Sequence, residues 1–332
     1  MKVWLLLSRL DHGGLERVQL NLAKALHAHG IDISLVAGQV LADTHKELPR
    51  GTSVLEVAKS GAAYFPAGLL RALCRDRPDF VFTTSNDVAC LMVLFRLLLF
   101  RRTRVIVAQH LSLSGPMEGA RGFTRLKLVL TLRAMRALVP RADGVVAVSR
   151  GVAEEILQKL GVSKDRLQVI YNPIVTPEFD VRTRDNVSWP WSDHDVKTII
   201  YVGRLSAVKR LDLLLESFEA ALRKRPIRLL IAGEGPLQNS LEVLIAEKGL
   251  QDHIWLTGFV SNPLPLMCKA AVLVLPSDYE GFGNVLVEAM ACGTQVIATN
   301  CPHGPAEILA GGKFGQLVPV DRFQDNSEGS TG

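Results

Sequence analysis

Residues 272–293 read VLVLPSDYEGFGNVLVEAMACG and contain a complete strand–loop–helix unit. The apolar run Val272–Leu275 predicts a buried strand, and the glycine-rich loop after it leads into an amphipathic helix. Apolar runs alternate with helical patterns in the same way along the rest of the chain. Because this alternation is typical of parallel sheets joined by crossover helices, the sequence predicts an α/β fold.

The predicted strands fall into two groups. The first group is Lys2–Leu7, Ile33–Ala37, Ser53–Val57, Phe80–Thr83, Val105–Ala108, Gly144–Val148 and Gln168–Ile170. The second is Thr198–Val202, Arg228–Ala232, Ile254–Thr257, Val272–Leu275, Val296–Ala298 and Gln316–Val318. We therefore expect two Rossmann-like domains that face each other across a cleft, residues 1–172 and 198–320, with a linker at 173–197. Residues 321–332 are polar and are expected to form a tail.

Composition excludes several classes of protein. The chain has 332 residues, of which 48% are hydrophobic and 21% charged, and this excludes a disordered chain. Its 5 cysteines contain no C-x-x-C pair and fit neither a disulfide framework nor a zinc site, which favours a reducing compartment. The apolar stretch Val88–Phe100 carries Arg96 and is shorter than the about 20 residues that span a bilayer. It is either a core helix or a helix that dips into a membrane surface.

Positive charge is concentrated in the first half of the chain. Up to Asn172 there are 24 Lys and Arg against 14 Asp and Glu, a net charge of +10, whereas the remainder carries −5. Between Arg96 and Arg141, basic residues alternate with apolar ones: Arg101, Arg102, Arg104, Arg121, Arg125, Lys127, Arg133 and Arg136. A helix over Phe123–Val139 with this composition suits an anionic membrane surface, although a solvated helix face is the simpler alternative. A nucleic-acid partner is not expected, because no binding motif accompanies the charge.

Ligands of such sheets bind beyond the carboxyl ends of the strands, so the loops that follow strands are the candidate sites. Gly13 and Gly14 follow the first strand and begin a helix, where backbone N–H groups can bind an anion; a simple tight turn is the alternative. Arg204 and Lys209 follow the strand Thr198–Val202. A guanidinium and an ammonium in one loop can hold a diphosphate, unless they are only a solvated basic turn.

Residues 272–293 contain two carboxylates, one in the loop and one in the helix that follows it. Glu280 lies in the glycine-rich loop at the start of the helix, and Glu288 lies eight positions later inside it. Each can accept hydrogen bonds from neighbouring hydroxyls, such as those of a ribose or a hexose. For Glu280 the alternative is a carboxylate that only complements the helix dipole.

This stretch resembles the signature of two glutamates with seven residues between them in retaining glycosyltransferases of family 4, which have the GT-B fold. Other segments resemble the family in the expected order: 12–17 (HGGLER), 203–205 (GRL) with Lys209, 231–236 (IAGEGP) and 258–260 (GFV). Residues 301–309 (CPHGPAEIL) resemble a form seen in bacterial members that build surface polysaccharides.

The resemblance implies roles for individual residues. The basic pair that matches Arg204 and Lys209 holds the donor diphosphate, the carboxylate that matches Glu288 binds the ribose, and the one that matches Glu280 contacts the transferred sugar. His110, after the strand Val105–Ala108, resembles the histidine that points at that sugar; a surface or capping histidine is the alternative. Further donor-binding positions are Gly13, Gly14, Phe259 and Val260, and the backbone amides of Gly281, Phe282, Gly283 and Asn284. The family uses no metal ion and no catalytic cofactor, so none is expected.

The function implied is retaining transfer of a hexose-type sugar from a UDP- or GDP-sugar to a lipid-linked or polysaccharide acceptor. The expected location is the cytoplasm, peripheral on the inner face of the cell membrane. Members of the family usually end in a helix that crosses back to the first domain, and no such pattern follows Pro319. A catalytically impaired, membrane-associated homologue is therefore one alternative, and a nucleotide-sugar epimerase or an inverting transferase is another.

Overall fold

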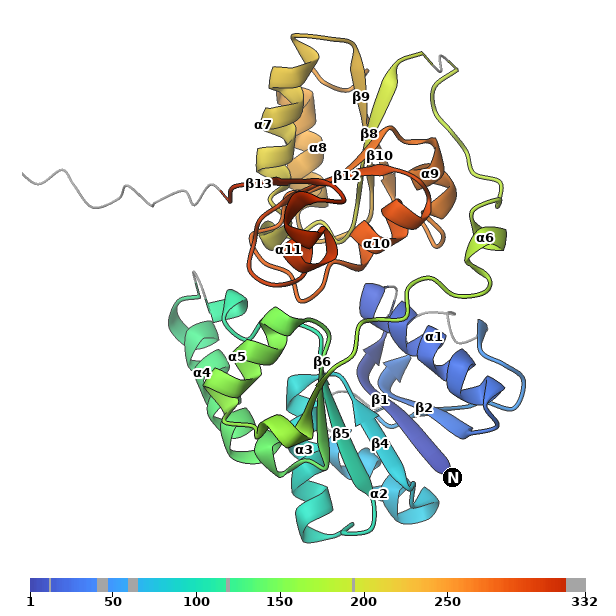
Figure 1. Ribbon diagram of the computed structural model, residues 1–332, viewed down its shortest axis with the longest axis vertical. Helices are drawn as coiled ribbons and strands as arrows, with labels where there is room; N and C mark the ends of the chain where they lie inside the picture. The colour runs from blue at the N-terminus through green and yellow to red at the C-terminus, as the bar shows by residue number, and fades with distance from the viewer. Residues whose placement is uncertain (12, 41–46, 59–64, 118–119, 193–194, 321–332) are drawn as a thin grey trace, which may run out of the picture.

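The computed structural model describes residues 1–320 except 12, 41–46, 59–64, 118–119 and 193–194. The predicted tail at 321–332 and the motif residue His12 lie outside the described residues. Figure 1 shows two units, one above the other, each built on its own sheet.

The first described sheet has seven parallel strands in the order β3-β2-β1-β4-β5-β6-β7. They are β1 (Lys2–Leu10), β2 (Asp32–Val40), β3 (Ser53–Glu56), β4 (Phe80–Thr83), β5 (Arg104–Gln109), β6 (Gly144–Ala147) and β7 (Leu167–Val169). The sequence predicted each of them. β1 continues three residues beyond its predicted end because Arg9 and Leu10 still pair with Gln39 and Val40 of β2.

The second sheet, as described, has six parallel strands in the order β10-β9-β8-β11-β12-β13. They are β8 (Lys197–Val202), β9 (Ile227–Ala232), β10 (Ile254–Gly258), β11 (Val272–Leu275), β12 (Gln295–Thr299) and β13 (Gln316–Val318). In both sheets the strand order reverses beside the first strand, as in dinucleotide-binding folds. The prediction of two Rossmann-like α/β units is confirmed.

Helices cover both faces of each sheet. They are α1 (Gly14–Ala28), α2 (Phe65–Asp76), α3 (Asn86–Leu98), α4 (Gly122–Leu138), α5 (Arg150–Leu160), α6 (Phe179–Arg182), α7 (Leu211–Leu222), α8 (Gln238–Glu247), α9 (Leu264–Lys269), α10 (Asn284–Ala291) and α11 (Gly304–Ile308). In Figure 1, α10 and α11 lie on the side of the upper unit that faces the lower one.

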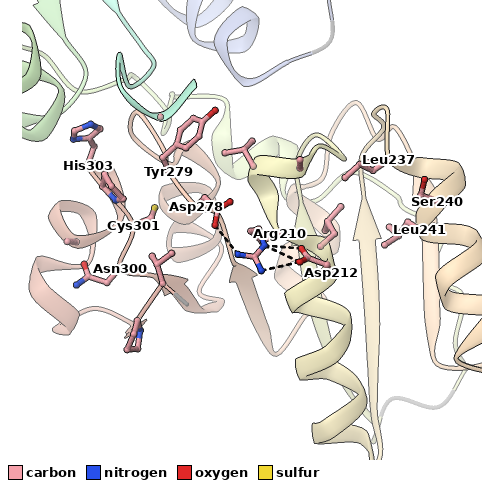
Figure 2. Close-up of a pocket in the computed structure, with 18 of the residues that line it drawn as sticks. Arg210, Asp212, Leu237, Ser240, Leu241, Asp278, Tyr279, Asn300, Cys301 and His303 are labelled. Carbon is pink, nitrogen blue, oxygen red and sulfur yellow. Dashed lines mark hydrogen bonds and ion pairs between the residues drawn. The ribbon is translucent and has the colours of Figure 1, made fainter. Parts of the chain in front are cut away.

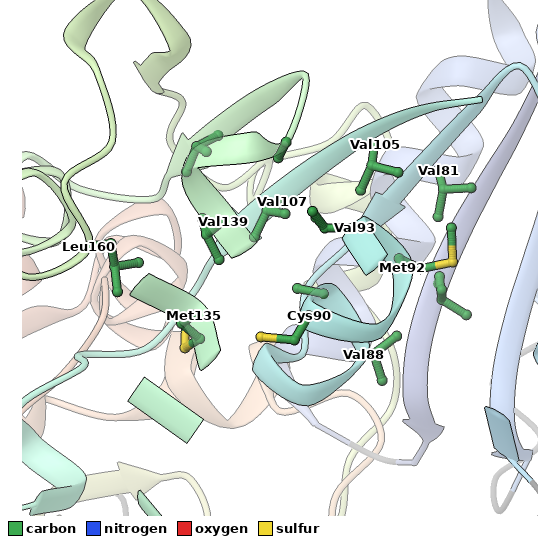
Figure 3. Close-up of a cluster of buried hydrophobic side chains, with 14 of the residues drawn as sticks. Val81, Val88, Cys90, Met92, Val93, Val105, Val107, Met135, Val139 and Leu160 are labelled. Carbon is green, nitrogen blue, oxygen red and sulfur yellow. The ribbon is translucent and has the colours of Figure 1, made fainter. Parts of the chain in front are cut away.

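Alternate residues of the strands fill two apolar layers. Along β1, Trp4 and Leu6 belong to one buried cluster, and Leu5 and Leu7 belong to another on the opposite face, with residues of α1. Figure 3 shows the first cluster, in which strand residues such as Val105 pack with residues of α3 and α4. Because side chains of a strand alternate between its faces, a strand covered on both sides is apolar almost throughout. This explains the unbroken apolar runs in the sequence.

The predicted linker is part of the second unit's core. Phe179 of α6 is 3% exposed and belongs to the cluster that contains Ile200 of β8, and Trp189 and Trp191 pack against the same cluster. The last residue of the predicted linker, Lys197, is already the first residue of β8. The segment shows no periodic pattern of apolar residues because most of its backbone is neither helix nor strand. Several of its side chains are nevertheless buried.

The apolar stretch 88–100 forms most of α3, whose first half is a core helix with Val88, Met92 and Val93 buried. Its end is exposed, with Leu98 and Leu99 at 65% and 59%. Arg96, the arginine noted within this stretch, is half-buried and forms an ion pair with Asp143 at 2.5 Å. Among the helices described, none has the length and apolar character needed to cross a membrane.

Candidate active site

The glycine pair after β1 meets the first residue of α10. Gly13 is the N-cap of α1, and a Cβ atom on Gly14 would lie 3.4 Å from Nδ2 of Asn284. Asn284 Nδ2 donates to the carbonyl of Gly14 at 3.4 Å, and its Oδ1 accepts from Asn172 Nδ2 at 2.8 Å. Two sites that the sequence predicted 270 residues apart therefore lie together between the two units.

Lys209 and Glu280 form an ion pair. Nζ of Lys209 lies 2.5 Å from Oε1 of Glu280, and the same oxygen accepts from Ser277 Oγ at 2.7 Å. The side chains are only 20% and 12% exposed, respectively. The structure thus brings together a predicted diphosphate ligand and a predicted sugar ligand, and it adds Ser277, which the sequence reasoning missed.

Arg204 is close enough to an unpredicted carboxylate of the other unit to act on its charge. Burial raises the pKa of Glu16, the nearby Asp11 raises it further, and Arg204 acts in the opposite direction. Glu16 is the third residue of α1, and its carboxylate reaches back so far that a Cβ on Gly13 would lie 2.4 Å from it. A glutamate three residues after the N-cap is the usual partner of the N-cap backbone. The spacing between Gly13 and Glu16 was therefore the signal by which the sequence could have marked Glu16.

Glu288 lies on α10 close to two arginines that were also not predicted. Burial raises the pKa of Glu288, while Arg182 and then Arg17 act to lower it. Arg182 is the last residue of α6, and it is fixed by Asn262, whose Oδ1 accepts from its guanidinium at 3.2 Å. Since Arg182 belongs to the irregular linker, no periodic pattern could have marked it.

His110 lies directly after β5 with a buried imidazole. Its Nε2 atom has no hydrogen-bond partner among the residues that the structure describes, and burial lowers its pKa to about 4. The ring is therefore neutral at pH 7. A Cβ atom on Gly281 would lie 1.8 Å from the carbonyl oxygen of His110, so only glycine fits there. The predicted histidine and the predicted sugar loop are thus in backbone contact.

The remaining predicted positions lie around α10 and β10. Gly283 is the N-cap of α10 with φ 101°, a left-handed conformation that favours glycine. Phe282 is buried and stacks on Tyr171 with 5.5 Å between ring centroids. After β10, the Phe259 amide donates to Glu234 at 3.2 Å and its ring is 39% exposed, whereas Val260 packs against the core.

The chain matches family models in both halves. The model described as Glycosyltransferase Family 4 matches residues 12–177, and the one described as Glycosyl transferases group 1 matches residues 196–328. A protein of Campylobacter jejuni is 30% identical over 264 residues, which cover 78% of this chain and 68% of that protein. Its name is N-acetylgalactosamine-N,N'-diacetylbacillosaminyl-diphospho-undecaprenol 4-alpha-N-acetylgalactosaminyltransferase. The chain belongs to glycosyltransferase family 4.

Another relative of this family 4 chain matches a smaller share of its length. The lipopolysaccharide 1,6-galactosyltransferase of Escherichia coli is 30% identical over 174 residues, which cover 51% of this chain and 46% of that protein. Among solved structures, sucrose-phosphate synthase from Thermosynechococcus elongatus has a TM-score of 0.76 at 19% identity, with 97% of this chain and 86% of that chain covered. Anabaena HepE in complex with UDP has a TM-score of 0.71 at 20% identity and the same coverage. This likeness shows that the glycosyltransferase has the GT-B fold.

A separate cavity of about 1340 Å³ lies beside the site. Its lining includes residues of α7, α8 and the loops around residues 208, 279 and 302, together with Gly115 of the first unit and Ala306 of α11. Arg204, Lys209, Glu280 and Glu288 are not among its described lining residues. Figure 2 shows Arg210 in its wall, held by Asp212 and Asp278 at 3.1 Å each. The cavity therefore lies next to the Lys209–Glu280 pair but is not lined by these four predicted donor ligands.

Proposed function

We propose that this glycosyltransferase moves a hexose-type sugar from a nucleoside-diphosphate sugar to an acceptor, with retention at the anomeric carbon. The observation that carries the proposal is the Lys209–Glu280 pair, which puts a cation for the diphosphate beside an acceptor for sugar hydroxyls. Glu280 already accepts from Lys209 and Ser277, which suits a carboxylate that orients hydroxyl groups.

Each residue would act on one part of the donor. Arg204 and Lys209 would bind the diphosphate and stabilise its charge as it leaves, assisted by the amides of Gly13 and Gly14 at the start of α1. Glu288 would accept from the ribose hydroxyls, and Phe259 and Val260 would lie by the base. The buried, neutral imidazole of His110 would donate or accept one hydrogen bond at the transferred sugar.

Retention would follow from attack on the same face of the sugar from which the diphosphate departs. The acceptor hydroxyl would lose its proton to the leaving phosphate oxygen, so no covalent sugar–enzyme bond is needed. We propose that neither a metal ion nor a cofactor takes part. Within the described ranges, no group of three or more His, Cys, Asp or Glu side chains is placed to bind a metal ion.

The acceptor we propose is a lipid-linked or polysaccharide sugar at the cytoplasmic face of a membrane. The Campylobacter relative is named for a diphospho-undecaprenol substrate and the Escherichia coli relative for lipopolysaccharide. On this chain, α4 exposes Phe123, Leu126 and Leu130 at 81%, 53% and 53%. The same helix carries exposed basic residues: Arg125, Lys127, Arg133 and Arg136. Apolar side chains among cations are suited to anionic lipid.

A panel of UDP- and GDP-sugars tests the donor. We expect one of them to raise the melting temperature of the protein, and Lys209→Ala to abolish that rise. Transfer to a synthetic lipid-diphosphate sugar, with the product's anomeric configuration determined by NMR, tests the reaction. An inverted product would overturn the retaining assignment, and a stabilising donor without transfer to any acceptor would point to an impaired homologue.

A further inference from the structure

A buried carboxylate on α5 holds the loop that follows His110. Glu155 is 6% exposed. It accepts from the Leu113 amide at 2.7 Å, from Ser112 Oγ at 3.3 Å and from Ser114 Oγ. Lys159, one turn later on α5, adds an ion pair at 3.3 Å. This single side chain therefore fixes the backbone and both hydroxyls of residues 112–114.

The same carboxylate reaches across to the other unit. Nε2 of His303 lies 3.2 Å from Oε2 of Glu155. The imidazole packs so closely on the start of α5 that a Cβ atom on Gly151 would lie 2.6 Å from its Nδ1. His303 has φ 76° and ψ −141°, a conformation that residues with a side chain rarely adopt. A strained backbone at a contact between the two units indicates that the contact is held by its surroundings.

His303 is in turn joined to the loop that carries Glu280. Its neighbour Pro302 accepts a hydrogen bond from the Glu280 amide at 3.4 Å. On its other side, a Cβ atom on Gly304 would lie 1.6 Å from the Phe282 carbonyl oxygen, so the two loops are in direct backbone contact. A continuous path of contacts therefore runs from residues 112–114 through Glu155 and His303 to Glu280.

The charges around this path favour an ionised Glu155. Burial alone would raise its pKa, but hydrogen bonds from His303, Ser114 and Leu113 hold the pKa of Glu155 well below its usual range. Lys159 from the same helix is the cation that pairs with it, and the His303 ring from the opposite loop lies within hydrogen-bond distance. A carboxylate kept charged in a buried place needs these partners, and moving one of them disturbs the others.

We infer that Glu155 and His303 are positioning residues for transfer, which fix the His110 loop against the Glu280 loop. The inference rests on the proposed function, since it assigns them to that site. Neither side chain needs to touch the donor. Their effect is to keep the buried imidazole of His110 and the Lys209–Glu280 pair in one arrangement, which is the arrangement that fast transfer requires.

A second contact across the same interface provides a matched control. Glu307 of α11 accepts from the Arg150 amide at 2.8 Å and from Tyr171 Oη at 2.6 Å. Those partners lie at the start of α5 and after β7, away from residues 112–114. Tyr171→Phe removes one such hydrogen bond and keeps the ring that stacks on Phe282. It therefore reports what a general weakening of the interface does.

The test compares Glu155→Gln, His303→Gln, the double variant and Tyr171→Phe. With the nucleotide sugar that the panel identifies, we expect each single variant to lower kcat at least tenfold while the donor KM changes less than about threefold. The double variant should be no slower than the slower single variant, because both remove the same contact. Tyr171→Phe should stay within about threefold of the wild-type kcat. Additive losses, or equal losses in Tyr171→Phe, would overturn the inference.

Hydrogen exchange without any substrate provides the independent readout. His303→Gln, a change in the second unit, should raise amide exchange in the peptide 110–117 of the first unit. Wild-type exchange there would overturn the inference even if transfer is slow. If no nucleotide sugar supports transfer, the proposed function fails, and the role of Glu155 and His303 in transfer fails with it. Hydrogen exchange still decides whether Glu155 and His303 couple the two loops. His303→Gly, which tolerates the positive φ, replaces any variant that fails to fold.

Discussion

The ammonium of Lys209 lies 2.5 Å from the carboxylate of Glu280, although 71 residues separate them in the chain. Their loops follow β8 and β11, which are neighbours in the second sheet at the point where the strand order reverses. Loops that leave adjacent parallel strands at this point diverge to opposite faces and leave a crevice between them. The pair therefore marks the crevice of the second unit, where the first unit's Gly14 also makes contact through Asn284.

Removal of the Lys209 ammonium should abolish most transfer. In Lys209→Ala, the ammonium beside Glu280 is lost and Arg204 is left without it to stabilise the departing diphosphate, so we expect kcat to fall about 100- to 1000-fold. Initial rates with the identified donor measure this, with circular dichroism to confirm the fold. Lys248→Ala is the matched control, because it breaks a comparable ion pair with Glu219 at 2.7 Å away from the cleft. Full activity in a folded Lys209→Ala protein would refute the diphosphate assignment.

Gly281→Ala should separate the two loops of the site. The new Cβ would lie 1.8 Å from the His110 carbonyl, so the backbones must move apart. We expect a loss of about 1–3 kcal/mol in the free energy of unfolding, as for other overpacked positions, and a fall in kcat of at least tenfold. Chemical denaturation and initial rates measure the two effects.

Gly249→Ala is the comparison for Gly281→Ala. Gly249 has φ 65° but nothing within 4 Å of an added Cβ, so alanine there costs about 1–2 kcal/mol of backbone strain and leaves the site intact. If Gly249→Ala loses as much activity as Gly281→Ala, the effect is global destabilisation and not separation of the loops.

The sequence was sufficient for the strands and for the loops that carry Arg204, Lys209 and Glu280, because parallel strands buried on both faces leave continuous apolar runs. It was not sufficient for Glu16, Arg182 or Glu155. Each of these lies in a segment with an ordinary local explanation, a helix start, an irregular linker or a helix face. Their importance comes from partners far away along the chain, and no local period records such partners. The same reasoning explains Arg96, whose pairing with Asp143 depends on how the end of α3 lies beside the residue that precedes β6.

His110 gives the folded protein a specific dependence on pH. Its pKa falls from 6.5 to about 4 because the ring is buried, so the folded state binds the proton less readily than the unfolded state. The resulting stability is present above about pH 6.5 and is lost as pH falls toward 4. We expect His110→Gln, which does not titrate, to lack this component. Chemical denaturation at a series of pH values measures the free energy of unfolding of wild type and of His110→Gln. The difference between these two free energies should become smaller as the pH falls toward 4. A constant difference from pH 7 to 4 would contradict the burial of the imidazole.

The exposed surface of α4 should bind anionic lipid. Vesicles of phosphatidylcholine with phosphatidylglycerol should carry the protein upward in a flotation gradient, and vesicles of phosphatidylcholine alone should not. Each basic residue near such a surface contributes about 1 kcal/mol, so reversal of Arg125 and Lys127 to Glu should weaken binding at least tenfold. Phe123→Ser should weaken it as well, because that residue is 81% exposed and has apolar surface to bury in the bilayer.

Arg225→Glu, which changes an exposed residue of the second unit, is the control and should have little effect on vesicle binding. Equal weakening by Arg225→Glu would show that net charge and not α4 is responsible, and failure of the wild type to float at moderate salt would remove the membrane from the proposed function.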